Sequence, residues 1–192
     1  MASAAASEIV SLNPEYAELE ERLANIEKRL DTTGDPNHIT LLVFSGELDK
    51  LLAAFNIANA AAACGTKVSM FFTFWGIASL KAKTVYGHKN FIERAFGFML
   101  PGGFSKRQLS RLDMAGLGRA LLSKEMRNKN VADLPAGIET AKKLGVELYL
   151  CEMTMNLMGI SEEELIDYSP IHSCGAPKFL AFDRNANTTL FI

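Results

Sequence analysis

Short apolar runs separated by longer amphipathic stretches form the dominant pattern of this chain from residue 38 onward. His38–Phe44, Lys67–Phe72 and Val146–Leu150 are short, apolar and rich in residues that favour strands, and Thr188–Ile192 ends the chain in the same way. Apolar runs of this length, bounded by turn residues, are typical of strands buried on both faces of a parallel sheet. The pattern therefore predicts a sheet built from these segments.

Amphipathic or alanine-rich stretches lie between the predicted strands. Glu47–Cys64 ends before Gly65 and Leu134–Leu144 ends before Gly145, and glycine is a common stop signal after a helix. Shorter helices are predicted at Phe91–Phe98, Glu152–Met158, Glu162–Ile166 and Pro177–Arg184. Strands that alternate with helices indicate βαβ units, so we expect an α/β fold with a mostly parallel sheet flanked by helices.

The first 37 residues follow a different pattern. Asn13 and Pro14 are typical of a helix start, and apolar residues then recur at heptad spacing, at Leu19, Leu23, Ile26 and Leu30. Three interpretations stay open: a helix packed on the domain, a loosely attached tail, and an oligomerisation helix. A linker rich in Thr, Gly, Asp and Pro follows at 31–37. We therefore divide the chain into an N-terminal segment, residues 1–37, and an α/β domain, residues 38–192.

Composition and charge exclude several classes of protein. The 192 residues are 48% hydrophobic and carry a formal net charge of −2, which excludes a disordered chain and a strongly basic nucleic-acid binder. The first residues show no targeting segment. Leu51–Thr66 and Val68–Leu80 are free of charge but too short to span a membrane. The second is apolar enough for membrane association, an interpretation that we do not favour.

Candidate chemistry gathers at the carboxyl ends of the predicted strands, where α/β sheets bind ligands. The segments that arrive there supply the candidate binding residues Ser45, Gly46, Thr73, Phe74, Trp75 and Met153. The turn that contains Ser45 and Gly46 either presents backbone N–H groups to a small anion or serves only as a tight turn. The aromatic residues line a pocket, form a subunit interface or belong to the core.

Cys151 is the residue that indicates most chemistry. It ends the apolar run VELYL and directly precedes the helical stretch EMTMNLM. Backbone N–H groups at a helix start stabilise a thiolate, which is the nucleophilic form and can carry a transferred sulfur. The alternative is a buried structural cysteine, because cysteine is among the most buried residues. The charge of Glu152 would work against the thiolate.

The remaining cysteines and the histidines give weaker signals. Cys174 lies in IHSCGAP, which we interpret as a loop before the last helix, and is either a second thiol or a passive loop residue. Cys64 is expected in the core. The odd number of three cysteines favours free thiols in a reducing compartment, hence the cytoplasm. His172 can assist proton transfer, but no histidine pair has metal-ligand spacing, so neither a metal nor a cofactor is expected.

A basic segment, Ser105–Asn130, lies between the second and third predicted strands. Its cations are Lys106, Arg107, Arg111, Arg119, Lys124, Arg127 and Lys129, against two acidic residues. Such a charge run is usually a solvated face. The other interpretations are that it docks an acidic partner, contacts a membrane surface or covers the Cys151 thiol.

Five collinear segments carry a resemblance to a known family: SGELDKLLAAFNIANAAAACG, VSMFFTFWGI, MLPGGFSKRQLSRLDMAGLG, KNVADLPAGIETAKKLGVELYLCEMTMNLMGI and EEELID. The sequence resembles the DsrE/DsrF/DrsH-like family, in its branch of larger stand-alone members. The resemblance implies a flavodoxin-like α/β fold, homo-oligomers and a role in sulfur handling. The cysteine of the C-x-M-x-M-x-x-M-G motif, which carries sulfur as a persulfide, falls on Cys151.

Two stretches depart from the family pattern. Asp113–Gly118 reads DMAGLG where Asn-Met-Gly-Gly is more usual, and Tyr168–Cys174 is unlike the typical ending. The second departure leaves the role of Cys174 open. Members of this branch often carry peroxiredoxin or NADH dehydrogenase labels, but no GxGxxG fingerprint or peroxidatic motif supports those labels here.

Residues and resemblance together predict a cytoplasmic sulfur carrier or sulfurtransferase that acts through Cys151. Its expected partners are sulfur donor and acceptor proteins and further copies of itself, with no nucleic acid. Two alternatives stay open. One is a non-catalytic oligomeric module that binds a small anion or nucleotide at the strand ends. The other is an oligomeric adaptor that uses the N-terminal helix and the basic segment.

Overall fold

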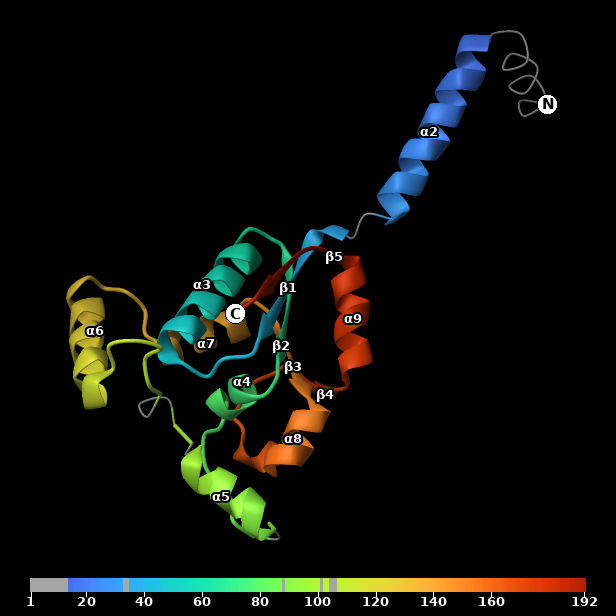
Figure 1. Cartoon of the computed structure of the whole chain (residues 1–192). Helices are drawn as coiled ribbons and strands as arrows, with labels where there is room; N and C mark the ends of the chain where they lie inside the picture. The colour runs from blue at the N-terminus through green and yellow to red at the C-terminus, as the bar shows by residue number, and fades with distance from the viewer. Residues whose placement is uncertain (1–13, 33–34, 88, 101, 104–106) are drawn as a thin grey trace.

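The computed structural model describes residues 14–32, 35–87, 89–100, 102–103 and 107–192. The described strands form one five-stranded sheet in the order β4-β3-β2-β1-β5, and all neighbouring strands run parallel (Figure 1). They are β1 (Asp35–Val43), β2 (Lys67–Phe72), β3 (Glu147–Cys151), β4 (Ile171–Cys174) and β5 (Ala186–Phe191). This sheet, with helices on both faces, confirms the predicted flavodoxin-like α/β fold.

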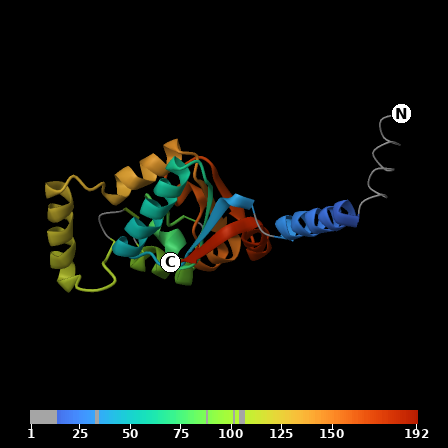
Figure 2. The same ribbon diagram turned by 90° about the horizontal axis from the view of Figure 1, so that it is seen from above.

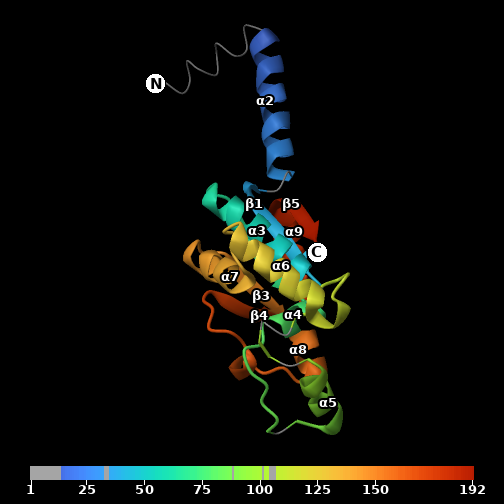
Figure 3. The ribbon, with the colours of Figure 1, turned by 90° about the vertical axis from the view of Figure 1, so that its left-hand side faces the viewer.

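Two layers of helices bury the sheet. Helices α3 (Leu48–Ala63) and α7 (Leu134–Lys143) cover one face, and α9 (Ala176–Asn185) covers the other (Figures 1 and 3). Phe72 packs on Phe55 of α3, with ring centroids 6.2 Å apart, whereas Phe71 packs on Phe179 of α9 at 5.1 Å. Successive strand residues point to opposite faces. The apolar run of β2 is therefore continuous because both of its faces are buried.

β4 is the strand that the sequence did not predict. We interpreted Ile171–Pro177 (IHSCGAP) as a loop, and this was wrong for Ile171–Cys174, which pairs with β3 along its length. The physical reason is its place at the edge of the sheet, where His172 and Ser173 are exposed and no apolar pattern is needed. β1 likewise begins at Asp35, inside the predicted linker, because Asp35 pairs with Ala186 of β5.

The helices between the strands follow the prediction with three exceptions. One is α6 (Leu117–Asn128), a helix inside the basic segment where none was predicted. The short helix α4 (Trp75–Ser79) was missed because its apolar sequence continues that of β2. The helix predicted after residue 162 is only a 3₁₀ turn, η3 (Glu162–Glu164). The other described helices are α5 (Phe91–Met99) and α8 (Glu152–Met158), and α6 follows the 3₁₀ turn η2 (Met114–Gly116).

The N-terminal helix α2 (Pro14–Thr32) projects away from the domain (Figures 1 and 2). Its apolar residues Leu19, Leu23 and Ile26 are each about half exposed, so the helix is not packed on the domain. The tail before Pro14, the side chain of Leu30, His88 and the start of the basic segment, 105–106, lie outside what the structure describes. Of the helices that it does describe, none combines the length and apolarity required to cross a membrane.

A buried ion cluster holds the irregular segment that follows α4. The Glu164 side chain is fully buried, and Lys89 Nζ lies 2.8 Å from both of its carboxylate oxygens. Lys81 Nζ is 3.7 Å away, and the Val85 N–H donates to Glu164 Oε1 at 2.6 Å. Burial would raise the pKa of Glu164. The hydrogen bonds from Lys89, Val85 N–H and Ser161 N–H outweigh burial and hold that pKa below its usual range.

We expect Glu164→Gln to destabilise the fold, because it leaves the buried ammonium groups of Lys81 and Lys89 without a carboxylate. The free energy of unfolding should fall by about 3–5 kcal/mol, the usual cost of breaking a buried ion pair. Glu163→Gln, at the exposed neighbouring residue, should change it by less than about 0.5 kcal/mol. Chemical denaturation measures both, and equal stability of the two variants would contradict the assignment.

The same cluster predicts a pH dependence for the unmodified chain. A carboxyl group whose pKa is lowered by folding stabilises the protein above its unfolded-state pKa of about 4.3. That contribution should disappear as the pH falls through the lower folded-state pKa. Glu164→Gln should lose less stability than the parent chain between neutral and acidic pH.

Candidate functional site

Cys151 and Cys174 lie side by side at the carboxyl edge of the sheet. They are partner residues in the parallel pairing of β3 with β4, as the last residue of each strand. Partner residues on neighbouring parallel strands point to the same face. Cys151 is 4% exposed and Cys174 is half-buried. We call these two residues the thiol pair. Their pairing was not predicted, because the sequence pattern led us to interpret Cys174 as a loop residue.

Aromatic contacts identify the face that the thiol pair occupies. Tyr149 and His172, two residues earlier on the same strands, have ring centroids 5.2 Å apart. Tyr149 also packs on Phe182 of α9 at 4.3 Å. Because side chains two residues apart share a face, the thiols point toward the side of the sheet that α9 covers. His172 is exposed and lies on the same face of β4 as Cys174, two residues earlier in the strand.

Charges around the thiol pair affect Cys174. Burial raises the pKa of the Cys174 thiol, and the negative charges of Glu152 and Cys151 raise it further. Lys178, in the first turn of α9, acts in the opposite direction. Glu152 is the first residue of α8. The charge of Glu152, which follows Cys151 in the sequence, therefore raises the pKa of Cys174.

Thr154, in the first turn of α8, joins this helix to the loop after β2. It is fully buried, and its Oγ1 lies 3.2 Å from Thr73 Oγ1 and accepts a 3.2 Å hydrogen bond from the Phe74 N–H. Phe74 has a φ of 45°, a left-handed conformation that is costly for a bulky residue. Thr154 was missed by the sequence analysis, and the one signal for it was a small polar residue within an apolar helical stretch.

The predicted anion-binding turn is occupied largely by internal contacts. The Ser45 N–H donates to Ile192 O at 3.4 Å, and the Glu47 N–H donates to Ser45 Oγ at 3.3 Å. Ser45 Oγ in turn donates to Glu47 Oε2 at 2.9 Å. At Gly46 a Cβ would lie 2.6 Å from the Trp75 carbonyl oxygen, so the close approach of the two loops requires glycine. These contacts support the interpretation as a tight turn.

An aromatic cluster continues this edge of the sheet. The ring centroid of Phe44 lies 5.5 Å from that of Phe74 and 6.1 Å from that of Phe191. Trp75 and Met153, both predicted as binding residues, are about half exposed. The structure thus places the predicted residues along one edge, with the thiol pair at the β3 and β4 end and Trp75 at the end of β2.

Cys64 is exposed at the C-terminal end of α3, so its predicted place in the core was wrong. It caps the helix where the chain turns toward β2, and a residue at that turn contacts solvent. Within the part of the chain that the structure describes, no group of three His, Cys, Asp or Glu side chains is placed to hold a metal ion.

Part of the basic segment is built into the fold. Arg107 is only 8% exposed and donates from Nη2 to the Ala78 carbonyl oxygen at 2.5 Å. Burial lowers the pKa of its guanidinium to about 10. Arg119 Nε lies 2.7 Å from Asp113 Oδ1, and its Nη1 donates to the Arg107 carbonyl oxygen at 3.3 Å. The interpretation as a solvated face is therefore wrong for these two arginines and holds for exposed Arg111.

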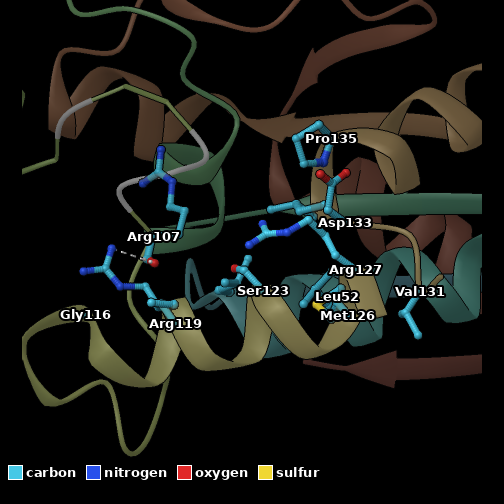
Figure 4. Close-up of a pocket in the computed structure, with 13 residues that line it drawn as sticks. Leu52, Arg107, Gly116, Arg119, Ser123, Met126, Arg127, Val131, Asp133 and Pro135 are labelled. Carbon is cyan, nitrogen blue, oxygen red and sulfur yellow. Dashed lines mark hydrogen bonds between the residues drawn. The ribbon is translucent and has the colours of Figure 1, made fainter. Parts of the chain in front are cut away.

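A cavity of about 520 Å³ separates α6 from α3 and α7 (Figure 4). Arg119, Ser123 and Arg127 of α6 line one side, and Leu52 and Asp133 lie across from them. Neither member of the thiol pair lines this cavity. The basic segment is instead bonded to the start of α3: the Gln108 carbonyl oxygen accepts from the Leu48 N–H at 2.8 Å, and the Ser110 N–H donates to Asp49 Oδ1 at 2.9 Å. These contacts do not place it over Cys151.

Comparison with known proteins identifies relatives over almost the whole domain. The sequence pattern of the DsrE/DsrF/DrsH-like family matches residues 36–191. The chain is 40% identical over 161 residues to the uncharacterized protein YrkE of Bacillus subtilis (strain 168), covering 83% of this chain and 99% of that protein. It is 29% identical over 163 residues to the sulfur carrier protein DsrE2 of Allochromatium vinosum, covering 80% and 97%. These matches confirm the family resemblance of the sequence.

The two classes of arginine in the basic segment can be told apart by stability. We expect Arg107→Ser to lower the free energy of unfolding by about 1–3 kcal/mol, because it leaves the Ala78 carbonyl oxygen unpaired and a gap in the interior. Arg111→Ser should change it by less than about 0.5 kcal/mol. Thermal and chemical denaturation provide the measurement, and an unchanged stability of Arg107→Ser would show that its burial has no structural role.

Proposed function

This chain belongs to the DsrE/DsrF/DrsH-like family, and on that premise we propose that it is a sulfur-relay protein whose Cys151 carries sulfane sulfur as a persulfide. The observation that carries the proposal is the position of Cys151. It ends β3 and directly precedes α8, at the edge where parallel sheets bind ligands. The relative named as a sulfur carrier protein, 29% identical over 163 residues, supports this kind of chemistry.

The proposed cycle has two transfers that conserve sulfur and charge. The Cys151 thiolate attacks the terminal sulfur of a donor persulfide, and the donor leaves as a thiolate. The acceptor thiolate then attacks the terminal sulfur on Cys151, which leaves as a thiolate in turn. Each step is a thiol exchange in which the attacking group is the thiolate.

The burial of Cys151 suits a carrier. A persulfide held at a site that is 4% exposed is shielded from stray thiols in solution. A partner protein approaches it from the edge where half-exposed Met153 and half-buried Cys174 lie. Donor and acceptor proteins in the reducing cytoplasm are therefore the proposed partners.

Homo-oligomer formation is part of this proposal, and exposed apolar side chains support it. Phe71 and Phe72 are buried in the core, but the predicted heptad positions of α2 that the structure describes are exposed. Further exposed apolar residues lie on α5 and α6, with Phe91 and Phe98 of α5 at 87% and 79% exposure. Large exposed apolar side chains that gather on one helix usually mark contacts between proteins.

The carrier proposal predicts a sulfur adduct on one cysteine. Incubation with thiosulfate or polysulfide should add about 32 Da, one sulfur atom, at Cys151, which peptide mass spectrometry detects. Cys64→Ser is the background for this experiment because Cys64 is exposed and can react on its own. Cys151→Ser should abolish the adduct. A sulfur adduct that persists in Cys151→Ser would show that another residue carries the sulfur.

The assembly proposal predicts a particle larger than one chain. Light scattering at micromolar concentration should give a multiple of 21.0 kDa. The double variant Phe91→Ser and Phe98→Ser should shift the distribution toward the single chain if α5 forms the contact. Arg111→Ser, an exposed change elsewhere, should leave it unaltered. A parent chain of 21.0 kDa would contradict the proposal.

A further inference from the structure

We propose that Cys151 and Cys174 act as a dithiol pair, in which Cys174 resolves the sulfur on Cys151 by closing an intramolecular disulfide. The closing step that releases sulfide rests on the proposed carrier function. The formation of the disulfide by an ordinary oxidant does not, since it requires only that the two thiols can meet.

Register is the first argument. Cys151 and Cys174 are direct partners on neighbouring parallel strands, and such strands lie about 4.8 Å apart. Disulfides form between residues whose Cα atoms are about 4.4–6.8 Å apart. Unlike a pair that is one residue out of register, direct partners also present their Cβ atoms to the same face. The backbone therefore already meets the main geometric requirement for a disulfide.

The neighbouring side chains support this geometry independently. Tyr149 and His172 are the partner residues two positions earlier, and their rings are in contact at 5.2 Å. That contact shows that side chains along this pair of strands meet across the ladder on the α9 face. The thiol pair is the next pair on that face, and the charge of Cys151 acts on Cys174.

The edge position of Cys174 allows the remaining adjustment. Cβ atoms of a disulfide are about 3.5–4.5 Å apart, slightly closer than strand spacing brings them. β4 is a four-residue strand at the edge of the sheet, and among the described strands its one neighbour is β3. Gly175 follows Cys174. A small shift of the end of β4 toward β3 costs little core packing, because His172 and Ser173 are exposed.

The two thiols also differ in accessibility, which assigns their roles. Cys151 is buried, whereas Cys174 is half-buried and closer to solvent. An oxidant such as glutathione disulfide therefore meets Cys174 first and forms a mixed disulfide with release of one glutathione thiolate. Attack by Cys151 on the Cys174 sulfur then releases the second glutathione. In total, two thiols lose two electrons and two protons while one disulfide is reduced to two thiols.

With a persulfide on Cys151, the same pair performs a different exchange. The Cys174 thiolate attacks the Cys151 sulfur that is bonded to carbon, and the bond to the terminal sulfur breaks. Hydrosulfide leaves, and Cys151 and Cys174 are joined. The terminal sulfur is reduced, Cys174 is oxidised, and a thiol reductant must reopen the disulfide before the next turnover.

The experiment begins without sulfur donors, in the full chain carrying Cys64→Ser. After incubation with excess glutathione disulfide and removal of the glutathione, the protein is unfolded in guanidinium chloride at about pH 8, where free thiols ionise, and exposed to iodoacetamide. We expect no alkylation, a mass lower by about 2 Da for the two lost hydrogens, and a tryptic species that joins the peptides of Cys151 and Cys174. Cys174→Ser in the same background should give no cross-linked species. Glutathione adducts without cross-linking in the parent would overturn the proposal.

The second measurement loads the chain with polysulfide, removes the excess and follows the adduct of about 32 Da over time. Cys174→Ser should retain the adduct at least tenfold longer and release sulfide correspondingly more slowly. Equal lifetimes would overturn the resolving role. If the disulfide forms but Cys151 never takes up sulfur, the carrier function fails while the dithiol pair stands. The melting temperature of Cys174→Ser verifies that this near-isosteric change leaves the fold intact.

Discussion

β3 pairs in parallel with β2 on one side and with β4 on the other, and these two registers position the candidate site. Pairing with β2 brings the loop at Thr73 and Phe74 against the first turn of α8, where Thr154 holds it by hydrogen bonds. Pairing with β4 places Cys174 beside Cys151. Because side chains alternate between faces, a shift by one residue in either register would separate these groups.

The burial of the sheet differs between its central strand, β2, and its edge strand, β4. At β2, apolar side chains on both faces form the core between α3 and α9, as at Phe71 and Phe72. At β4, the edge strand is half solvated, so the second thiol stays within reach of solvent. The sheet edge therefore places a buried thiol, Cys151, next to a more accessible one, Cys174.

Buried charges hold the segments that lack regular structure. Glu164 anchors the region after α4 through Lys89 and Lys81, and Arg107 attaches the basic segment to the Ala78 carbonyl oxygen. Burial of these charges costs desolvation free energy. The ion pairs and hydrogen bonds of Glu164 offset that cost, whereas Arg107 keeps a buried Nε without a hydrogen-bond partner among the described residues. The long connection between β2 and β3 is therefore positioned by polar contacts, whereas the sheet is held by apolar packing.

The sequence by itself determined the strands β1, β2 and β3, the long helices α3 and α7, and the position of Cys151 between β3 and the helix that follows it. Strands buried on both faces must be continuously apolar, and a cysteine between such a strand and a helix lies at the ligand-binding edge of the sheet. Only the tertiary structure decided what depends on contacts between distant segments. β4 has no apolar pattern because it lies at the sheet edge, so its pairing, and with it the meeting of Cys174 with Cys151, left no trace in local periodicity. The same holds for Arg107, since a charged residue in a basic run shows its burial only once the chain folds back onto Ala78.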